Sequence, residues 1–400
     1  MAQYKMLDGN AAAMEAIKMA RVKVISAYPI TPQSPIAEKL SDMVVSGELD
    51  AKYVRVESEH TALSVALGAQ LTGVRTATAT ASVGLALMHE IVNVVSGLRI
   101  PIVMPVVNRA LAAPWSLWCD HQDSMEERDS GWLQVYCENV QDVFDLVSCA
   151  YRIAEHEKVL LPCMVCLDGF FLSHSMQKVS VPDTAAMDAF IGPYVRHNLY
   201  VDPADPMLVG NLTPSDEFGE MRYQQRVGFT EAEGVMDQIF REFEQTFGRH
   251  HARAEGYRLE DADTVLITLG SMSGTAKCVV NELRQAGQKV GLLKIVSFRP
   301  FPHALVRELL AGKKQVLVLD RSSGLGAQFA PLCTEINAAL HGMDVPVRGY
   351  VAGLGGRDIS LQTIRNTFAH GAVNPGAADG SVWIDVRDDA MEIRQVLKAE

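Results

Sequence analysis

Three residues have side-chain types and positions that could do chemistry together. Glu59 lies in the segment VESEH, Arg109 follows the apolar run IPIVMPVVN, and Thr31 lies between Pro29 and Pro32. A carboxyl can hold a proton, a guanidinium offers a planar fork of donors that matches a carboxylate, and a hydroxyl can donate to a nearby oxygen. The prolines would keep the Thr31 loop stiff. These residue types suit a site for a small ligand that carries a carboxylate.

Each of the three also has a reading that needs no ligand. Glu59 could cap a helix that begins near His60, because acidic residues are favoured at helix N-termini. Arg109 could form a surface salt bridge, and Thr31 could bond to the backbone of its own turn. The residues alone leave both readings open.

The elements that must position these residues form an α/β pattern. β-rich runs are predicted at residues 23–30, 53–58, 75–82, 100–108, 133–139 and 160–169, with helical patterns such as 10–20 and 60–73 between them. This alternation predicts βαβ units around a parallel sheet, which binds ligands at the carboxyl ends of its strands. We take residues 1–176 as a first open α/β domain.

Two further parts follow. Residues 177–260 are loop-like at first and then fit one long helix or two shorter ones over 220–248, so we expect a connecting arm. Residues 261–400 form a second open α/β domain. Its strands are expected at 263–270, 289–298 and 314–322 and its helices at 273–287, 302–312 and 329–342.

Composition excludes several classes of protein. The chain has 400 residues and a formal net charge of -12 with no basic stripe, which argues against nucleic-acid binding. The apolar run at residues 98–107 is far shorter than the roughly 20 residues that cross a bilayer. No secretory signal pattern opens the chain. A soluble cytoplasmic protein without a membrane partner is expected.

The seven cysteines are read as reduced thiols. Cys163 and Cys166 form a lone CxxC on a predicted buried strand, where packing is the simpler explanation. An iron–sulfur cluster needs four ligands, commonly from a CxxCxxC run and a further cysteine, and no such run occurs.

Other polar groups are given no catalytic role. Asp120, His121 and Asp123 are adjacent but need not converge on an ion, so we predict no metal site. His250 and His251 are expected on a solvated surface. The glycine-rich segments 322–327 and 353–358 match no phosphate-binding motif and are predicted to be tight turns.

A family resemblance sharpens these expectations. YPITPQ, VESEH, GLALMHE, NRALAAPW, DHQDSM, RDSGW, LPCMVCLDGF and SFRPFP occur in the order and approximate spacing of the alpha chains of multi-subunit pyruvate:ferredoxin oxidoreductases. The chain thus resembles this branch of the 2-oxoacid:ferredoxin oxidoreductase family over nearly its whole length. The resemblance implies a pyrimidine-type thiamine diphosphate domain followed by a domain like the transketolase C-terminal domain.

The resemblance also implies roles for individual residues. Glu59 would hydrogen-bond N1′ of the cofactor's aminopyrimidine ring, and Thr31 and Arg109 would contact the 2-oxoacid. Pro29, Ser82 and Val83 would line the cofactor. The implied reaction, in anaerobic metabolism, is oxidative decarboxylation of pyruvate with coenzyme A as co-substrate.

Partners follow from an absence in the sequence. No GDG segment, the usual anchor of the diphosphate and its Mg²⁺, occurs in the chain. The resemblance therefore implies a hetero-oligomer. A beta subunit would share the thiamine diphosphate and hold the Mg²⁺, and gamma and ferredoxin-like delta subunits would complete a complex whose partners carry the [4Fe-4S] clusters and pass electrons to ferredoxin or another acceptor.

Substrate identity has alternatives. Related chains often carry an amide at the position of Val83, and the change to an apolar residue, with Trp115 and Trp118 nearby, keeps open a phenylglyoxylate or branched-chain 2-oxoacid oxidoreductase. A different class of protein, a non-catalytic scaffold subunit with a degenerate thiamine fold, is also open.

Overall fold

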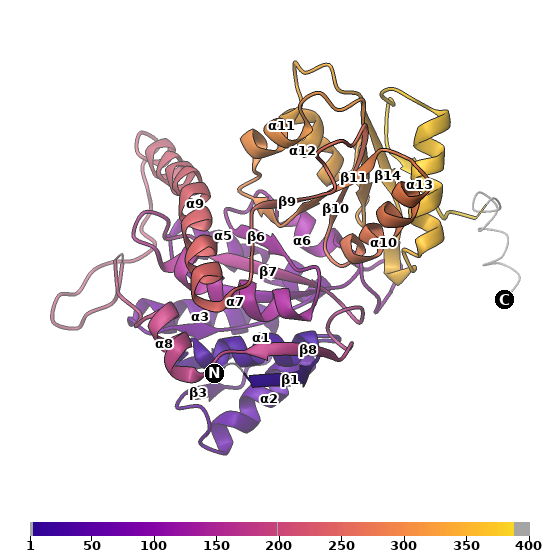
Figure 1. The fold of residues 1–400 in the computed structure, drawn as a ribbon. Coiled ribbons are helices and arrows are strands. Elements are labelled where there is room, and N and C mark those ends of the chain that lie inside the picture. The colour runs from indigo at the N-terminus through magenta and orange to yellow at the C-terminus, as the bar shows by residue number, and fades with distance from the viewer. Residues whose placement is uncertain (1–2, 198, 388–400) are drawn as a thin grey trace, which may run out of the picture. The chain divides into compact units, whose positions relative to one another are not determined.

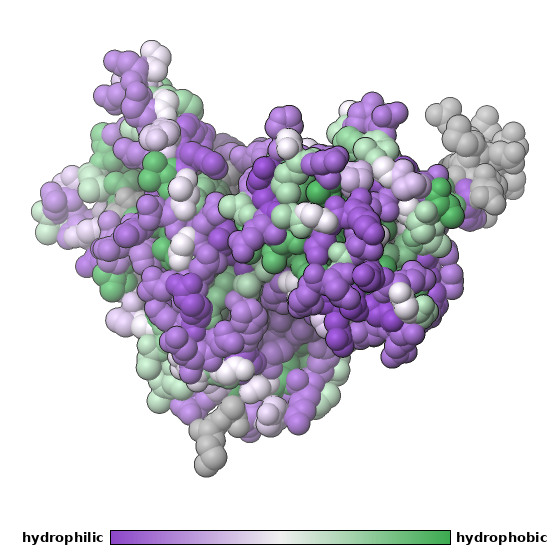
Figure 2. Space-filling view, turned by 45° about the horizontal axis from the view of Figure 1, so that its top comes forward, coloured by the Kyte–Doolittle hydropathy of each residue, from purple (hydrophilic) through white to green (hydrophobic). Residues whose placement is uncertain are grey.

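The protein, described by a computed structural model for residues 3–197 and 199–387, divides into two compact units. The first comprises residues 3–255, 269–274 and 294–302, and the second comprises 256–268, 275–293 and 303–387. Within the described residues, no helix has both the length and the apolar character to cross a membrane. Hydrophilic side chains cover much of the face drawn in Figure 2, with smaller hydrophobic patches between them.

Strands and helices alternate through the first unit (Figure 1). Its elements are β1 (Gln3–Leu7), α1 (Gly9–Met19), β2 (Val24–Ser26), α2 (Ser34–Val45), β3 (Lys52–Val54), α3 (Glu59–Leu71), β4 (Thr76–Ala77), α4 (Ser82–Leu87), α5 (His89–Gly97), β5 (Val103–Asn108), α6 (Gln122–Glu126), β6 (Leu133–Tyr136), α7 (Val140–Glu155), β7 (Cys163–Asp168), β8 (Gln177–Val181), α8 (Thr184–Ile191), α9 (Phe218–Phe247) and β12 (Ser297–Arg299).

The first unit contains two groups of parallel strands that meet. One has the order β3-β2-β4, and the other has the order β12-β6-β7-β5, in which only β12 is antiparallel to its neighbour. A parallel bridge between Thr80 and Val106 joins the groups. The carboxyl ends of the parallel strands therefore share one edge, where ligands of open α/β sheets bind.

Helices α1 and α7 pack together and supply much of the core. Helix α1 begins after Asp8, whose Oδ1 accepts a hydrogen bond of 2.7 Å from the backbone N–H of Ala11. Ala12, Ala13 and Ala16 are fully buried. Alanine combines high helix propensity with a small side chain, so this helix can lie close to its neighbours.

The strands and helices predicted for the first domain are all present, but one later strand was predicted wrongly. Residues 289–298 form two strands, β11 (Val290–Ile295) and β12, and β12 pairs with β6. An antiparallel pair of β1 and β8, far apart in sequence, also lies in the first unit (Figure 1). Both differences are pairings between distant segments, which local periodicity does not encode.

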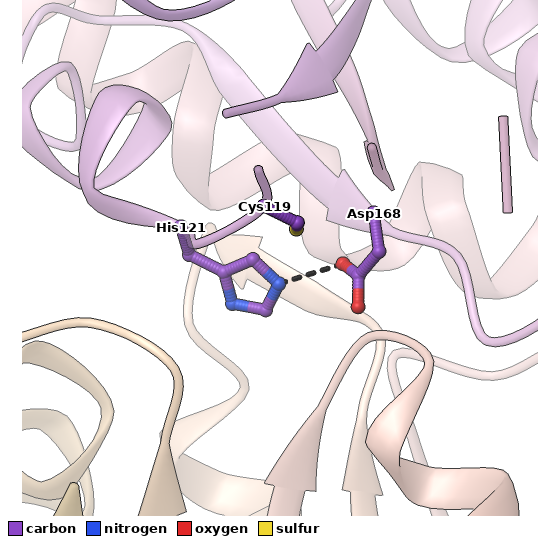
Figure 3. Close-up of side chains that lie close together, drawn as sticks. All are labelled: Cys119, His121 and Asp168. Atoms are coloured by element: carbon purple, nitrogen blue, oxygen red, sulfur yellow. Dashed lines mark hydrogen bonds and ion pairs between the residues drawn. The ribbon is translucent and has the colours of Figure 1, made fainter. Parts of the chain in front are cut away.

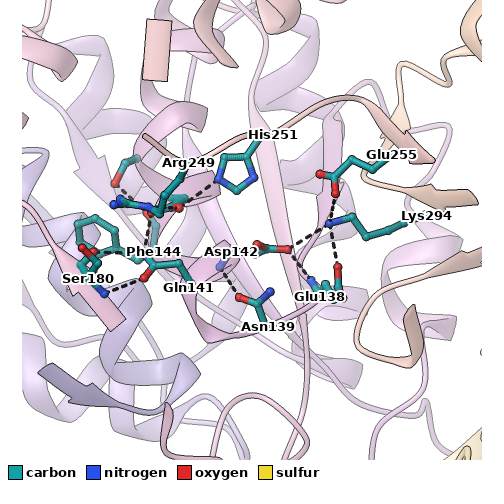
Figure 4. Close-up of polar contacts among 12 residues, drawn as sticks. Glu138, Asn139, Gln141, Asp142, Phe144, Ser180, Arg249, His251, Glu255 and Lys294 are labelled. Atoms are coloured by element: carbon teal, nitrogen blue, oxygen red, sulfur yellow. Dashed lines mark hydrogen bonds and ion pairs between the residues drawn. The ribbon is translucent and has the colours of Figure 1, made fainter. Parts of the chain in front are cut away.

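The long helix expected in the arm is confirmed as the single helix α9. Residues 177–255 belong to the first compact unit, so the limits of a separate arm remain a proposal. The segment after α9 is bound to α7: Arg249 Nε lies 2.7 Å and His251 Nε2 lies 3.1 Å from Oδ2 of Asp145. Figure 4 shows the side chains of Arg249 and His251 near each other. His250 is exposed as predicted, but His251 is buried, and the prediction of a solvated surface is wrong there because Asp145 draws it inward.

A second charged cluster follows in the same unit. Lys294 Nζ lies 3.0 Å from Glu138 Oε2, 2.8 Å from Glu255 Oε2 and 3.6 Å from Asp142 Oδ2 (Figure 4). Burial alone would lower the pKa of Lys294, but the three carboxylates outweigh it and the pKa is raised. The ammonium is therefore held in its charged form.

The second unit is built on its own sheet, as predicted. Its strands lie in the order β15-β14-β13-β10-β11-β9. The elements are β9 (Ala254–Tyr257), β10 (Thr264–Leu269), α10 (Met272–Gln285), β11, α11 (His303–Leu310), β13 (Gln315–Asp320), α12 (Pro331–Ala339), β14 (Val347–Val351), a 3₁₀ turn η1 (Leu354–Gly356), α13 (Leu361–Val373) and β15 (Val382–Trp383). Gly353, Gly355 and Gly356 have positive φ, which confirms a tight turn there.

All seven cysteines lie in the described part of the chain and are free thiols, as predicted. Cys163 and Cys166 are both buried in β7, and burial raises the pKa of both thiols. Packing therefore accounts for the CxxC.

Candidate functional site

Four of the predicted site residues follow strands at the shared sheet edge. Thr31 follows β2, Ser82 and Val83 follow β4, and Arg109 directly follows β5. Arg109 Nη1 donates a 2.9 Å hydrogen bond to the backbone carbonyl of Thr31. The structure thus brings Thr31 and Arg109 together.

Arg109 has a buried guanidinium in which Nε and Nη1 form hydrogen bonds and Nη2 forms none to a described residue. It is 5% exposed, and its Nε donates to the carbonyl of Ser116 at 3.1 Å. Burial lowers its pKa and the carboxylate of Asp123 opposes that shift, but a guanidinium stays charged under any ordinary condition. Within the described residues, Nη2 has no hydrogen-bond partner. The surface salt bridge considered above is not formed, and Nη2 can bind a carboxylate.

Thr31 is exposed, and the peptide bond between Thr31 and Pro32 is cis. Its backbone carbonyl is bonded to Arg109, but its hydroxyl bonds to no other described residue. The local turn bond considered above is absent. The hydroxyl can therefore donate to a ligand.

Glu59 is the first residue of α3 but is not the residue that caps it. Ser58 is the N-cap, and its Oγ accepts from the backbone N–H of Thr61 at 3.2 Å. The Glu59 side chain is 7% exposed, and within the described residues its carboxyl has no hydrogen-bond partner. The carboxyl oxygens are not fully enclosed, so the carboxyl can bond to a ligand.

Gly84 lies close to both the Glu59 carboxyl and the Thr80 hydroxyl. A β-carbon added to Gly84 would lie 2.7 Å from Glu59 Oε1 and 2.7 Å from Thr80 Oγ1. The Thr80 hydroxyl is buried and also has no hydrogen-bond partner in the part of the chain that the structure describes. Two unpartnered polar groups therefore face the same small region, which fits a polar edge of a bound ring.

Ser82 and Val83 are the first two residues of α4. Ser82 has a φ of 50°, in the left-handed region, and its Oγ donates to the carbonyl of Ala110 at 2.5 Å. Its hydroxyl is therefore used inside the protein. Val83 is half-buried and Pro29 is exposed, and both are apolar residues that can contact a planar ring.

Asp123 holds these loops together, and sequence reasoning missed its role. It is 2% exposed, and its Oδ2 accepts from the backbone N–H groups of Ser82 at 2.9 Å and Arg109 at 3.0 Å. Oδ1 accepts from Asn108 Nδ2 at 2.8 Å. Burial raises the pKa of Asp123 to about 6, and these hydrogen bonds partly oppose the rise. The sequence shows the segment DHQDSM, but the groups that bond to Asp123 lie in segments distant in the chain.

The three polar residues of that segment do not converge. Asp120 accepts from the backbone N–H of Gln122 at 3.0 Å, whereas His121 turns towards Asp168, with Nε2 2.7 Å from Oδ1. Figure 3 shows Cys119 beside this pair. Asp120, His121 and Asp123 therefore form no cluster. His121 instead lies with Cys119 and Asp168, which come from two segments of the chain.

Two tryptophans of the loop after Arg109 are exposed. Trp115 is 75% and Trp118 is 54% exposed, and the Trp118 ring lies 4.6 Å from the Phe170 ring, centroid to centroid. Because both rings are largely exposed, they can contact a ligand or a partner.

Comparison with known proteins places this geometry in context. Residues 15–241 match the family described as "Pyruvate flavodoxin/ferredoxin oxidoreductase, thiamine diP-bdg" and residues 262–364 match "Pyruvate:ferredoxin oxidoreductase core domain II". The chain is 45% identical to pyruvate synthase subunit PorA of Methanocaldococcus jannaschii, over 97% of this chain and 99% of that one. It is 42% identical to ketoisovalerate oxidoreductase subunit VorA of Pyrococcus horikoshii, over 90% and 92% of the two chains.

Solved structures share the fold. A 2-oxoglutarate:ferredoxin oxidoreductase from Magnetococcus marinus, solved with 2-oxoglutarate, coenzyme A and succinyl-CoA, matches 92% of this chain with a TM-score of 0.72 and 20% identity, and the match spans 65% of that chain. A split-gene transketolase matches 92% of this chain and 99% of its own, with a TM-score of 0.55 and 12% identity. The expected α/β fold with a thiamine diphosphate-binding domain is confirmed, and the chain shares its fold with a transketolase.

Proposed function

The chain belongs to the pyruvate:ferredoxin oxidoreductase family, and from this premise we propose that it is the alpha subunit that binds the pyrimidine half of thiamine diphosphate together with the 2-oxoacid. The reaction is the coenzyme A-dependent oxidative decarboxylation of pyruvate. The observation that carries the proposal is the carboxyl of the largely buried Glu59, which bonds to no described residue, at the sheet edge that also holds Arg109. Bound thiamine diphosphate supplies the electron sink for decarboxylation.

Glu59 shares a proton with the pyrimidine nitrogen N1′. Ser58 already caps α3, so the carboxyl is left for this bond. The Thr80 hydroxyl lies near Gly84, as the Glu59 carboxyl does, and it bonds to no described residue. It can orient either the carboxyl or the ring. Val83 and Pro29 form apolar walls, and Ser82 contributes the shape of its backbone.

Arg109 and Thr31 bind the substrate. The bonds from Arg109 to the carbonyls of Thr31 and Ser116 fix the guanidinium before substrate arrives. Its Nη2 then pairs with the substrate carboxylate, and the Thr31 hydroxyl donates to a second oxygen. Because the fork is already ordered, little further conformational entropy is lost on binding.

The remaining parts of the site come from partners. The chain lacks a GDG segment, so a beta subunit supplies the ligands of the diphosphate and of Mg²⁺. Gamma and ferredoxin-like delta subunits complete a cytoplasmic complex. This complex passes electrons through iron–sulfur clusters to ferredoxin or another acceptor. Within this chain we assign the pyrimidine domain to 1–176, a connecting arm to 177–260 and the transketolase-like domain to 261–400.

The test is the variant Glu59→Gln in the purified complex. The amide cannot exchange the proton, so turnover of pyruvate should fall by about 10²- to 10⁴-fold, the usual contribution of a positioned acid or base. Glu57→Gln is the matched control, because Glu57 is exposed in the same segment, and it should keep full turnover. Full activity of Glu59→Gln would contradict the proposal, as would an equal loss in Glu57→Gln.

A second candidate substrate has specific support. VorA, a ketoisovalerate oxidoreductase subunit, is almost as similar as PorA, and the apolar Val83 suits a branched or aromatic side chain. Comparing kcat/KM for pyruvate, 2-oxoisovalerate and phenylglyoxylate decides between them. A complex that binds no thiamine diphosphate would instead favour the scaffold reading.

A further inference from the structure

A thiol, an imidazole and a carboxyl meet inside the first unit. They belong to Cys119 and His121, both in the loop after β5, and to Asp168, the last residue of β7. One ligand atom from each lies within 4.8 Å of the other two, and all three residues are buried. Figure 3 shows the His121 ring and the Asp168 carboxyl facing each other with Cys119 alongside.

The Asp168 carboxyl is arranged as a metal ligand would be. Its Oδ1 faces His121 Nε2 at 2.7 Å, while Oδ2 accepts from the backbone N–H of Ser271 at 3.2 Å and from the Ser271 hydroxyl. One oxygen is thus oriented by outer donors and the other points at the histidine. Carboxylate ligands of metals are commonly oriented in this way.

Space beside the cluster is kept by a glycine. Gly270 has a φ of 74°, and a β-carbon at this position would lie 3.0 Å from Asp168 Oδ1 and 3.1 Å from His121 Cε1. Any other residue would fill the volume next to both groups. Because Gly270 has no side chain, the Asp168 carboxyl and the His121 ring have room to adjust around an ion.

We propose that Cys119, His121 and Asp168 form a zinc-binding site with a fourth position open to water or another small ligand. Thiolate, imidazole and carboxylate are the three side-chain ligands of Zn²⁺, and one of each suits this borderline-soft cation better than Mg²⁺ or Ca²⁺, which take oxygen ligands. The thiolate and carboxylate together balance the two charges of the ion.

The geometry requires small movements. Zn–S bonds of about 2.3 Å and Zn–N or Zn–O bonds of about 2.0–2.2 Å place tetrahedral ligand atoms roughly 3.3–3.6 Å apart. His121 and Asp168 would separate slightly, and the sulfur would approach them. Both movements are side-chain rotations, and the ion would displace the proton between His121 and Asp168 and the thiol proton of Cys119, both of which would pass to solvent.

Zinc at this site would fix the substrate loop. The loop runs from Arg109 to His121, and the ion would tie its far end to β7 and to the segment that carries Gly270 and Ser271. The site has no part in the proposed thiamine chemistry. Its existence therefore does not depend on the proposed function.

The experiment measures zinc in the full chain, produced with the partners that it purifies with. After dialysis against a chelator, added Zn²⁺ should bind at one equivalent per chain above any partner site and raise the unfolding temperature, because a ligand that binds only the folded state stabilises it. Co²⁺ in its place should give a thiolate-to-cobalt charge-transfer band. No such band in the unaltered chain would overturn the proposal, whether or not any variant folds.

Variants identify the ligands. Cys119→Ser should abolish the cobalt band, and Cys119→Ser and His121→Asn should each weaken zinc binding by at least about 100-fold, with Ser271→Ala weakening it by about 10-fold, as outer-shell changes do. Cys278→Ser, at an exposed thiol in α10, is the matched control and should bind zinc normally. Unchanged binding in Cys119→Ser, or equal loss in Cys278→Ser, would contradict the proposal.

Discussion

Gly84 and Glu59 are so close that no side chain fits between them: a β-carbon at Gly84 would lie 2.7 Å from Glu59 Oε1 and 2.9 Å from its Cγ. Gly84 lies in α4 and Glu59 opens α3. The glycine therefore sets the position of the carboxyl that the proposed chemistry requires.

Gly84→Ala should inactivate the complex without unfolding the chain. The new methyl must displace the Glu59 carboxyl, and a misplacement of about 1 Å can lower a rate by roughly 10²-fold. We expect kcat with pyruvate to fall by about that factor while the unfolding temperature changes little, because alanine favours a helix. Both quantities are measured on the purified complex.

Gly68→Ala is the control for this substitution. Gly68 lies in α3, and an added β-carbon there meets no atom within 4 Å. It should keep full activity. Normal turnover in Gly84→Ala would show that Glu59 is not constrained by this contact.

Asp123→Asn should loosen two loops at once. Each Asp123 oxygen accepts N–H groups, Oδ2 from Ser82 and Arg109 and Oδ1 from Asn108, so an amide nitrogen at either place faces a donor. Leaving a buried donor unsatisfied costs about 1–3 kcal/mol. We expect a lower unfolding temperature and a higher KM for the 2-oxoacid.

Asp129→Asn provides the comparison, because Asp129 is 77% exposed at its side chain and forms only surface ion pairs among the contacts described. The unfolding temperature and the KM for the 2-oxoacid are measured for both variants. A KM that stays at its normal value in Asp123→Asn would argue against the role of Asp123 in holding Arg109.

Arg109→Lys should weaken substrate binding although it keeps the charge. The guanidinium bonds to two carbonyls and still has Nη2 for the substrate, whereas one ammonium cannot reach all three directions. Loss of a charged hydrogen bond is worth about 1.5–3 kcal/mol, so KM should rise by roughly 10- to 100-fold. Arg21→Lys, at an exposed ion pair with Asp188, should leave KM unchanged, and a normal KM in Arg109→Lys would refute the assignment.

His251 should stabilise the fold more in mildly acidic solution than in alkaline solution. Burial lowers its pKa, but the hydrogen bond and charge of Asp145, aided by Asp142 and Glu255, raise it overall above 6.5. A raised folded-state pKa means that the stabilisation is complete below pH 6.5 and is lost as pH rises through the folded pKa.

The measurement is the difference in unfolding temperature between the unaltered chain and His251→Gln from pH 6 to pH 9. The difference should be largest at about pH 6, where the charged hydrogen bond contributes about 1.5–3 kcal/mol, and shrink at higher pH. Arg249, which shares Asp145, is charged throughout this range and does not alter the sign. A difference that grows with pH would contradict the prediction.

The sequence by itself determined the alternation of strands and helices, the single long helix α9, and the residues Thr31, Glu59 and Arg109 at the ends of strands. These features are local: periodicity sets each element, and parallel strands place their carboxyl ends at one edge. The family match also needed only the order of short motifs.

Only the tertiary structure decided which side chains meet. The contact of Gly84 with Glu59, the use of Asp123 by two loops, the inward turn of His251 and the approach of Asp168 to Cys119 and His121 all join segments far apart in the chain. Such contacts depend on how whole elements pack, and a residue's type and immediate neighbours carry no information about which distant group will lie beside it.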